Sequence, residues 1–366
     1  MLVLAVAGYD LVVFTTMSST MASSHALDGL PGSTDGSTNI LLMGLDTRKD
    51  QYGQQLPANV LDALHAGDGS EGGYNTNTLI LMHIPGHGGT VRAFSIPRDD
   101  VVDVPGYGEL KIKEAYGNAK AAAEAAATRE GVSDPHQLET IGREAGRRLE
   151  INTVTALTGQ PIDHFAEVSL VGFYDLANAL GGVQVCLNHA VDDSAYSGAV
   201  FPAGMQHLNG AQALAFVRQR HGLANGDLDR TRRQQAFLAS ASREIRSIGT
   251  IANPFATTRL MNAAKRDIVI DHQWGALSMA MQLRHLTGGN TTFDTLPIVG
   301  FTTVNGESAN EIDPDQIRQI ISSAFASHPG DTPSGGDAPE TAATTAAASA
   351  AATAASAATP NATCVD

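Results

Sequence analysis

The sequence predicts a single α/β domain in which helices cover both sides of a mixed central β-sheet. Short apolar runs of strand length lie at residues 40–45, 78–84 and 90–96. Helical patterns lie between and after strand-like runs, at residues 114–129, 138–157, 170–180, 234–247, 273–286 and 314–326. This mixture of short strands and longer helices favours one sheet packed against helices.

Composition narrows the classes of function. The 366 residues carry a net charge of -15 and are 43% apolar, which is enough for a substantial core. Nucleic acid is not expected as a partner, because nucleic-acid-binding domains usually present a broad basic face. GxSxG, HExxH and Walker A motifs are absent, so the chain lacks the local signatures of serine hydrolases, zinc proteases and P-loop NTPases.

The first segment is apolar but short. Residues 1–14 contain one charge, Asp10, and no basic start, whereas a helix that spans a bilayer needs ~20 apolar residues. We interpret residues 1–17 as a truncated transmembrane or signal-anchor remnant, with a buried N-terminal strand as the alternative. Residues 18–38 are rich in Ser, Thr, Gly and Asp and are expected to form a spacer. The domain is then expected to occupy residues 39–326.

Polar residues follow the first strands. The run at 40–45 leads into Asp46 and Arg48, and functional side chains often lie where a rigid strand ends. A Gly-rich, polar insertion follows at residues 49–74. The runs at 78–84 and 90–96 are expected to pair, and the second ends at Arg98 and Asp99. Lys111 comes shortly after a Pro-Gly-Tyr-Gly turn.

The later elements are mostly scaffold. The alanines of 114–129 and 138–157 suit close helix packing. The helix at 170–180 ends at two glycines, a buried strand is expected at 183–187, and a late strand at 292–299. Residues 327–366 contain too little bulky apolar surface to offset the entropy of ordering, so this Ala/Thr/Ser-rich tail is predicted to be disordered.

The two cysteines have no metal-type spacing. Cys186 lies in an apolar run and Cys364 is third from the end. In an exported protein they could form a disulfide that ties the tail to the domain. Otherwise Cys186 is a buried apolar residue and Cys364 a tail residue without a role.

The most unusual stretch is LNGAQALAFVRQRHGLANGDLDRTRRQQ, residues 208–235. Five of the eighteen arginines fall within sixteen residues of it. Ion pairs on a solvated face are the simple explanation. However, Arg218 and Arg220 would project from the same side if this segment were extended. Two guanidinium groups suit a pyrophosphate, because Arg binds phosphate oxygens bidentately.

These residues fit phosphoryl transfer, which needs neutralised charge, positioning and a carboxylate that orients the nucleophile. We predict that the catalytic residues are Asp46, Arg98, Asp99, Arg218 and Arg220. The predicted substrate-binding residues are Arg48, Lys111, Asp227, Arg230, Arg233 and Gln234.

Four blocks in the same order resemble the LytR-CpsA-Psr (LCP) family. They are NILLMGLDTR at 39–48, AFSIPRDDVVDVPGYGELKIKEAYG at 93–117, PIDHFAEVSLVGFYDLANALGGVQV at 161–185 and the arginine stretch. The best match spans residues 39–238. The resemblance implies a phosphotransferase that moves a glycopolymer from a polyprenyl pyrophosphate carrier to peptidoglycan through a phosphodiester. It also implies a single-pass protein of the cell membrane, with the catalytic domain outside and apolar helices around the lipid.

By the same resemblance, Asp46 would help hold Mg²⁺ (or Mn²⁺), and Lys111 would lie beside the arginines that bind the pyrophosphate, which are Arg98, Arg218, Arg220 and Arg230. The family often has Arg-Ser-Asp-Thr where this chain has Asn-Thr-Asn-Thr at 75–78. Asn77 would then be the second metal ligand, through its amide oxygen. Alternatively, Asn77 is only a polar residue at the start of a strand.

Two other functions stay open. The chain could be a phosphohydrolase that cleaves lipid pyrophosphates with water, or a non-catalytic polyprenyl-phosphate-binding regulator of the cell envelope. The Ala-rich, Lys-poor composition suggests an actinobacterial source, for which arabinogalactan is the candidate glycopolymer.

Overall fold

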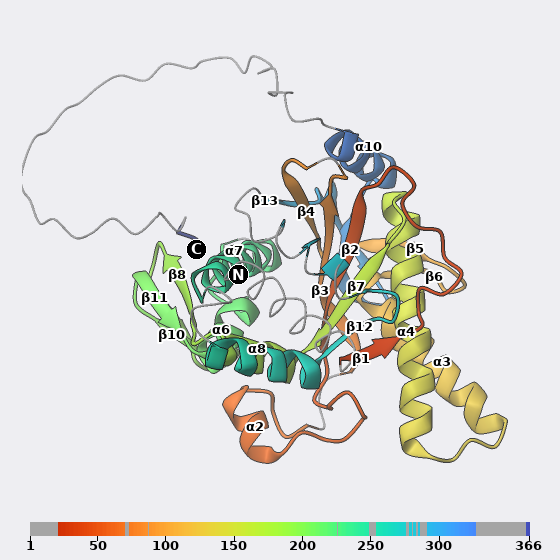
Figure 1. Ribbon diagram of the computed structural model, residues 1–366, viewed down its shortest axis with the longest axis horizontal. Coiled ribbons are helices and arrows are strands. Elements are labelled where there is room, and N and C mark those ends of the chain that lie inside the picture. Colours follow the sequence, from red (N-terminus) through yellow and green to blue (C-terminus); the bar gives the residue numbers. More distant parts are fainter. Residues whose placement is uncertain are drawn as a thin grey trace, which may run out of the picture.

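The computed structural model describes residues 21–69, 73–86, 88–224, 226–248, 254–275, 278–279, 281–282, 285, 291–326 and 364–366. Across these residues the central feature is a seven-stranded sheet in the order β1-β12-β7-β2-β3-β4-β13 (Figure 1). Its strands are β1 (Ala22–Ser24), β2 (Thr38–Asp46), β3 (Asn75–Ile84), β4 (Val91–Ile96), β7 (His164–Ser169), β12 (Ile268–Asp271) and β13 (Thr291–Thr295). β1 and β12, β2 and β7, and β4 and β13 are parallel pairs, and the other neighbours are antiparallel. The predicted mixed sheet is confirmed.

Helices cover both faces of the sheet, as predicted. One face carries α4 (Pro135–Thr158), with α3 (Ala115–Arg129) packed on it, and α10 (Pro314–Ala326) (Figure 1). The other carries α5 (Leu170–Ala179), α6 (Gly210–Arg218), α7 (Asp227–Ile248) and α8 (Pro254–Asp267). Successive side chains of β2 point to opposite faces of the sheet. Leu41 and Met43 pack toward α4 and α10, whereas Ile40 and Leu42 pack on the α8 side.

The remaining elements are short. Four two-stranded antiparallel sheets pair β5 (Val101–Val104) with β6 (Gly108–Lys111), β8 (Val183–Leu187) with β11 (Gly204–Leu208), β9 (Val191–Asp193) with β10 (Ala199–Phe201), and β14 (Gly300–Val304) with β15 (Glu307–Glu311). The insertion after β2 forms α2 (Ala58–Ala63), and η1 (Ile112–Glu114) follows β6. The strand predicted at 183–187 is thus confirmed, but it pairs with β11 and not with the main sheet.

Side-chain caps define where the helices begin. Asp134 precedes α4 and accepts the backbone N–H of His136 at 3.0 Å. Asn209 and Gln212 form a reciprocal capping box at α6. Ser169 is both the last residue of β7 and the N-cap of α5. Each cap of this kind contributes about 1 kcal/mol, and the cap at Ser169 fixes the strand-to-helix junction beside the candidate site.

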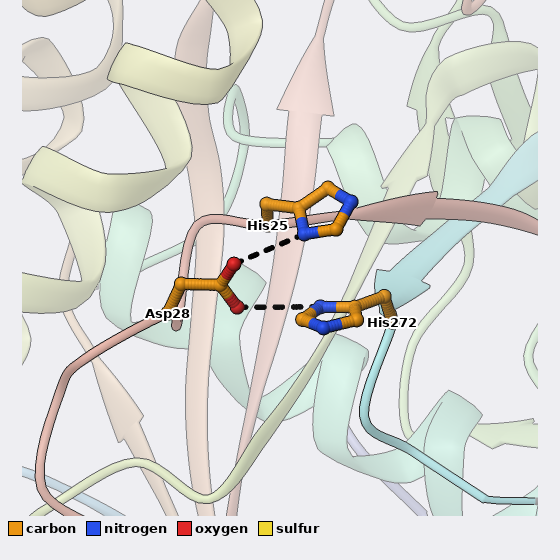
Figure 2. Close-up of side chains that lie close together, drawn as sticks. All are labelled: His25, Asp28 and His272. Atoms are coloured by element: carbon orange, nitrogen blue, oxygen red, sulfur yellow. Dashed lines mark hydrogen bonds and ion pairs between the residues drawn. The ribbon is translucent and has the colours of Figure 1, made fainter.

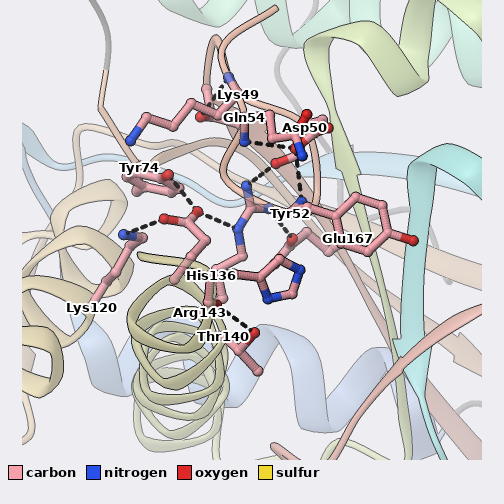
Figure 3. A network of polar contacts seen from close by, with 12 residues as sticks. Lys49, Asp50, Tyr52, Gln54, Tyr74, Lys120, His136, Thr140, Arg143 and Glu167 are labelled. Atoms are coloured by element: carbon pink, nitrogen blue, oxygen red, sulfur yellow. Dashed lines mark hydrogen bonds and ion pairs between the residues drawn. The ribbon is translucent and has the colours of Figure 1, made fainter. Parts of the chain in front are cut away.

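A buried polar network attaches α4 to the sheet and to the insertion (Figure 3). Glu139 on α4 accepts hydrogen bonds from Tyr74 at 2.5 Å and from Nε of Arg143 at 2.7 Å. Arg143 also reaches Glu167 on β7 at 3.4 Å and donates to the carbonyl oxygen of Asp50 at 2.5 Å. The contacts at Asp50 and Tyr74 connect both ends of the insertion to α4, and removing one charged member would leave the other buried charges unpaired.

The prediction that residues 18–38 form a spacer is wrong for residues 21–38, which the structure describes. Residues 22–24 form β1, parallel to β12, and Ala26 and Leu27 are buried in the core on the α4 side. A polar composition does not prevent backbone pairing, and hydrogen bonds also hold the segment: Ser24 donates to Glu144 and Arg148 donates to the carbonyl oxygen of Asp28, both at 2.8 Å. Residues 39–326 are therefore not the whole folded unit.

Three other expectations fall outside the described residues. These are the anchor remnant at 1–17, residues 276–277, 280, 283–284 and 286 of the helix at 273–286, and residues 327–363 of the predicted disordered tail. Among the helices that are described, none combines the length and the apolar character needed to cross a bilayer.

Candidate active site

A cavity of about 430 Å³ lies between the sheet and helices α5 to α8, within the ~300–1,000 Å³ range typical of ligand pockets. Most of its wall is apolar, with side chains from the sheet and from all four helices, including Leu42, Ile80, Phe173, Leu176, Leu214, Phe237, Leu238, Ile245 and Leu260. Its polar lining consists of Asp46, Asn77, Thr78, Arg98, Ser169, Arg218, Arg220, Arg230 and Gln234. The cavity therefore suits a ligand with a long apolar part and a compact anionic part.

Arg218 and Arg220 reach this cavity by a different route from the one the sequence suggests. Residues 215–217 belong to α6, so the prediction that this segment is extended is wrong. The run of apolar residues is helical because α6 buries it against neighbouring elements. Arg218 ends the helix and Arg220 follows one extended residue later. Arg218 donates to the carbonyl oxygen of Leu64 at 2.8 Å, so the insertion forms part of the site.

Three further guanidinium contacts converge on one carboxylate. Asp227 lies 3.4 Å from Nε of Arg98, 3.4 Å from Nε of Arg220 and 2.8 Å from Arg230. Burial lowers the pKa of Arg230 to about 9, with the charge of Arg98 and that of Arg220 adding to the effect and Asp227 opposing it. Positive charge thus exceeds negative charge in this part of the cavity, which favours an anionic ligand.

Two of these guanidinium nitrogens make no hydrogen bond. Within the described part of the chain, Nε of Arg98 and Nε of Arg230 are buried without a hydrogen-bond partner, although Nε of Arg98 has carboxylate oxygens at ion-pair distance. Buried donors are nearly always satisfied in folded proteins. Both atoms belong to residues that line the cavity, so the oxygens of a bound phosphate group would complete their hydrogen bonding.

Asp46 lies at the end of β2 in a chain of polar contacts. Its carboxylate pairs with Arg48 and accepts a hydrogen bond from Nδ2 of Asn77 at 2.7 Å. Oδ1 of Asn77 in turn accepts from Arg98 at 2.7 Å. The structure therefore brings together four of the residues singled out in the sequence, although Arg48 supports Asp46 from outside the cavity lining.

The oxygen donors fit a magnesium-type ion when phosphate is present. Asp46 is the one carboxylate among the described cavity-lining residues, and the side chain of Asn77 is next to it. Magnesium is usually held by one or two carboxylates together with substrate phosphates and water. Asp46 and Asn77 could supply two ligands, provided that Oδ1 of Asn77 turns away from Arg98.

Asp99 and Lys111 lie beside the cavity but do not line it. Lys111 is 3% exposed and pairs with Glu307 at 2.6 Å. Asp99 pairs with Lys113 at 2.6 Å and with Nε of Arg98 at 3.4 Å. Although burial opposes it, the charge of Arg98 and the hydrogen bond from Lys113 hold the pKa of Asp99 below its usual value. Asp99 is thus placed to orient Arg98.

Arg233 and Gln234 are neighbours with different surroundings. Gln234 lines the cavity. Arg233 is fully buried outside it, where Nε donates to the main-chain oxygen of Asp366 at 2.6 Å and Nη1 donates to Oε1 of Gln219 at 2.5 Å. Arg233 therefore connects the last residue of the chain to the segment between Arg218 and Arg220.

A disulfide joins Cys186 to Cys364, as hypothesised from the sequence. The N–H of Val365 donates to the carbonyl oxygen of Cys186 at 3.0 Å, and Val365 accepts from the N–H of Asn188 at 2.9 Å. The end of the chain is therefore held along β8, so the disorder predicted for the tail does not extend to residues 364–366.

Sequence reasoning missed several residues at the site. Ser169 and Thr78 line the cavity, Lys113 pairs with Asp99, and Leu64 accepts from Arg218. Ser169 could have been found as a polar residue between a strand and a helix. Leu64 contributes only its carbonyl oxygen, which leaves no side-chain signal.

Comparisons with known proteins agree with this architecture. The sequence profile of the LytR_cpsA_psr family matches residues 12–324. The chain is 44% identical to the cell wall biosynthesis protein LcpA of Corynebacterium glutamicum over 293 residues, which cover 80% of this chain and 56% of LcpA. It is 26% identical to the polyisoprenyl-teichoic acid–peptidoglycan teichoic acid transferase TagU of Oceanobacillus iheyensis, over 78% of this chain and 74% of TagU.

Solved structures show the same fold. TagV of Bacillus subtilis superposes with a TM-score of 0.56 at 21% identity, covering 81% of this chain and all of that one. TagT bound to LI-WTA has a TM-score of 0.56 at 18% identity, covering 83% and 97%. The chain spans just over half the length of the corynebacterial relative. The family profile covers most of the sequence, and the chain therefore belongs to the LytR-CpsA-Psr family.

Proposed function

We propose that this protein is a phosphotransferase that moves a glycopolymer from a polyprenyl pyrophosphate carrier to peptidoglycan and leaves it attached through a phosphodiester. The observation that carries the proposal is the junction of an apolar cavity with four arginines, Arg98, Arg218, Arg220 and Arg230. An isoprenoid chain matches the apolar wall and a pyrophosphate matches the guanidinium groups. The names of the TagU relatives, which are teichoic acid transferases, support the same class of reaction.

In the proposed reaction a hydroxyl oxygen of peptidoglycan attacks the phosphorus atom that carries the glycopolymer. A new P–O bond forms, the pyrophosphate P–O bond breaks, and polyprenyl phosphate leaves with the bonding electrons. The proton of the hydroxyl is released and can be taken up by the departing phosphate. Arg218, Arg220 and Arg230 are placed to neutralise the charge that develops on the phosphate oxygens, which is the main requirement of phosphoryl transfer.

We propose that the same site holds a divalent cation. When bound, Mg²⁺ or Mn²⁺ would neutralise phosphate charge, with Asp46 and Asn77 as its side-chain ligands. Arg48 restrains Asp46, and Asp99 restrains Arg98. These contacts hold the site in place before the substrate arrives, so less reorganisation is needed during the reaction.

Further details of the proposal come from the relatives and from the disulfide. The identity with a protein of Corynebacterium supports an actinobacterial glycopolymer, for which arabinogalactan is our candidate. The Cys186–Cys364 disulfide supports a location outside the cytoplasm, because disulfides persist in oxidising environments. We propose a single-pass protein of the cell membrane with the domain described above on the outer side.

A transfer assay tests the proposed function. Purified protein is incubated with a polyprenyl-pyrophosphate-linked glycan, Mg²⁺ and peptidoglycan, and the products are identified by mass spectrometry. Transfer predicts that glycan linked to muropeptide through phosphate appears together with polyprenyl phosphate. Free glycan phosphate formed at the same rate without acceptor would instead indicate a phosphohydrolase. Lipid that stays bound without turnover would indicate a regulator.

A further inference from the structure

A second group of potential ligands lies outside the cavity. Figure 2 shows the carboxylate of Asp28 beside the imidazole rings of His25 and His272, with one oxygen directed at each ring. Within the part of the chain that the structure describes, this is the one group of three His, Cys, Asp or Glu residues whose ligand atoms all lie within 4.8 Å of one another. No residue of this group contributes to the site described above.

The fold itself places the two histidines side by side. β1 and β12 are parallel, with Ser24 opposite Asp271. The N–H of His272 donates to the carbonyl oxygen of Ser24 at 3.0 Å, so the pairing continues one residue past the strands. His25 and His272 are the next residues of the two strands, and their ring centroids are 4.1 Å apart.

A turn then brings Asp28 back toward both rings. The N–H of Asp28 donates to the carbonyl oxygen of His25 at 3.0 Å, which closes the turn. Gln273 donates to Oδ1 of Asp28 at 3.3 Å and helps to orient the carboxylate. Polar neighbours that orient a ligand in this way are a regular feature of metal sites.

The spacing of the donor atoms is that of ligands around a small cation. Nδ1 of His25 lies 3.0 Å from Oδ2 of Asp28, and Nδ1 of His272 lies 3.4 Å from Oδ1. Ligands held ~2.1 Å from a tetrahedral Zn²⁺ are separated from each other by roughly 3.4 Å. The His25, Asp28 and His272 side chains are 68%, 48% and 33% exposed, so an ion could enter and water could complete its coordination.

We propose that His25, Asp28 and His272 form a binding site for a zinc-class divalent cation. Two imidazole nitrogens and one carboxylate oxygen suit Zn²⁺, whereas Mg²⁺ and Ca²⁺ prefer ligand sets made of oxygen. The ion replaces the hydrogen bond between His25 and Asp28 and the ion-pair contact between His272 and Asp28 with three coordinate bonds.

The position of the site indicates a structural role. Ser169, the last residue of β7, lies opposite Leu45, which is next to Asp46 in β2. β12 runs antiparallel to β7, with Ile270 opposite Ala166, so His272 lies toward the first residue of β7. The cation site and the cavity are therefore at opposite ends of the sheet. β1 has three residues and one partner strand, so a cation bound by residues of both segments would fix the start of the domain to β12.

Calorimetric titration of metal-free, untagged protein with ZnCl₂ tests the proposal. We expect one high-affinity equivalent of Zn²⁺ in the parent protein and in Asp46→Ala, which alters the cavity at the other end of the sheet. His25→Gln, Asp28→Asn and His272→Gln should each weaken this affinity at least tenfold. The matched control is His136→Gln, which removes an exposed imidazole from α4 and should leave Zn²⁺ binding unchanged.

A second readout separates binding from folding. Zn²⁺ should raise the thermal midpoint of the parent and of His136→Gln but not that of the three site variants, whose far-UV circular dichroism should match the parent. The proposal is overturned if no high-affinity equivalent is found, if the site variants bind Zn²⁺ as tightly as the parent, or if His136→Gln loses binding to the same extent.

Discussion

At the scale of single residues, Arg220 is the most direct test of the anion site. It lines the cavity, is half-exposed and contacts only Asp227 among the ion pairs described. Arg220→Ala should therefore fold normally and reduce transfer ~100-fold or more, because it removes a fixed charge from the phosphate transition state. Arg218→Ala should have a comparable effect. Initial rates of transfer at saturating glycolipid, with near-UV circular dichroism as the check on folding, measure both.

Arg232→Ala is the matched control for these variants. Arg232 lies on α7 two residues after Arg230, but its side chain is 63% exposed and pairs with Asp229 away from the cavity. Its removal should leave the rate within about twofold of the parent. Equal losses in Arg232→Ala and Arg220→Ala would show that general charge, and not this site, controls the rate.

Asn77 offers a second prediction at this scale. In the protein without ligand its amide bridges Asp46 and Arg98 and adds no negative charge. A hard cation should bind weakly there until phosphate oxygens complete its coordination. Asn77→Asp should therefore tighten Mg²⁺ binding to lipid-free protein, and Asp46→Ala should abolish metal-dependent transfer.

Calorimetric titration with MgCl₂, with and without polyprenyl pyrophosphate, measures the first effect, and the transfer assay measures the second. Thr78→Ser is the control, since Thr78 also lines the cavity and keeps its hydroxyl group. Unchanged Mg²⁺ affinity in Asn77→Asp would separate Asn77 from the metal. Full activity of Asp46→Ala would remove the metal site from the mechanism.

At the scale of elements, α4 contains a buried acid whose pKa is raised above its ordinary value. Glu150 is fully buried, and burial raises its pKa to about 8 even though the N–H of Tyr116 donates to it at 3.1 Å. In the unfolded chain the same group releases its proton near pH ~4.3. The folded state thus binds more protons between these values. Its contribution to stability falls as pH rises through that window, by up to about 1.4 kcal/mol per pH unit.

Glu150→Gln removes this pH dependence. The free energy of unfolding of the variant, measured by urea at pH 5, 6.5 and 8, should rise relative to the parent as the pH increases. Glu130→Gln is the control, because Glu130 is exposed at the end of α3. A difference between Glu150→Gln and the parent that does not change with pH would contradict the argument.

The elements also show what the sequence could and could not predict. β2, β3 and β4 were predictable because apolar side chains follow one another along them. β7 was not, because Glu167 interrupts its pattern. That carboxylate is buried only because Arg143 and Arg147 of α4 pair with it, at 3.4 and 2.9 Å. A contact between residues far apart in the sequence has no local signature.

The candidate site also contains residues that the sequence could predict and residues that it could not. Asp46, Arg98, Arg218 and Arg220 could be predicted because strand ends and an arginine cluster are visible in the sequence. All four line one cavity. The sequence could not show that Arg230 lines the cavity whereas Arg233 does not. Both lie on α7, and only the packing of the helix and the position of Asp366 decide which of them faces the cavity.

At the scale of the whole molecule, the chain closes on itself beside the site. The disulfide joins residues 178 positions apart and holds Asp366 against Arg233, which also binds Gln219 between two cavity arginines. Closing so long a loop restricts the unfolded chain, and removing a native disulfide typically costs about 2–5 kcal/mol. Cys364→Ser should therefore lower the urea midpoint of oxidised protein.

Reductant provides the internal control for this last prediction. Treatment with dithiothreitol should lower the midpoint of the parent to that of Cys364→Ser and should not change the variant, since its disulfide is already absent. Because Arg233 would lose a restrained partner, the variant should also transfer glycan several-fold more slowly than the parent. It should nevertheless stay well above Arg220→Ala, which lacks a charge in the cavity itself. Equal midpoints for oxidised parent, reduced parent and Cys364→Ser would show that the covalent closure does not stabilise the fold.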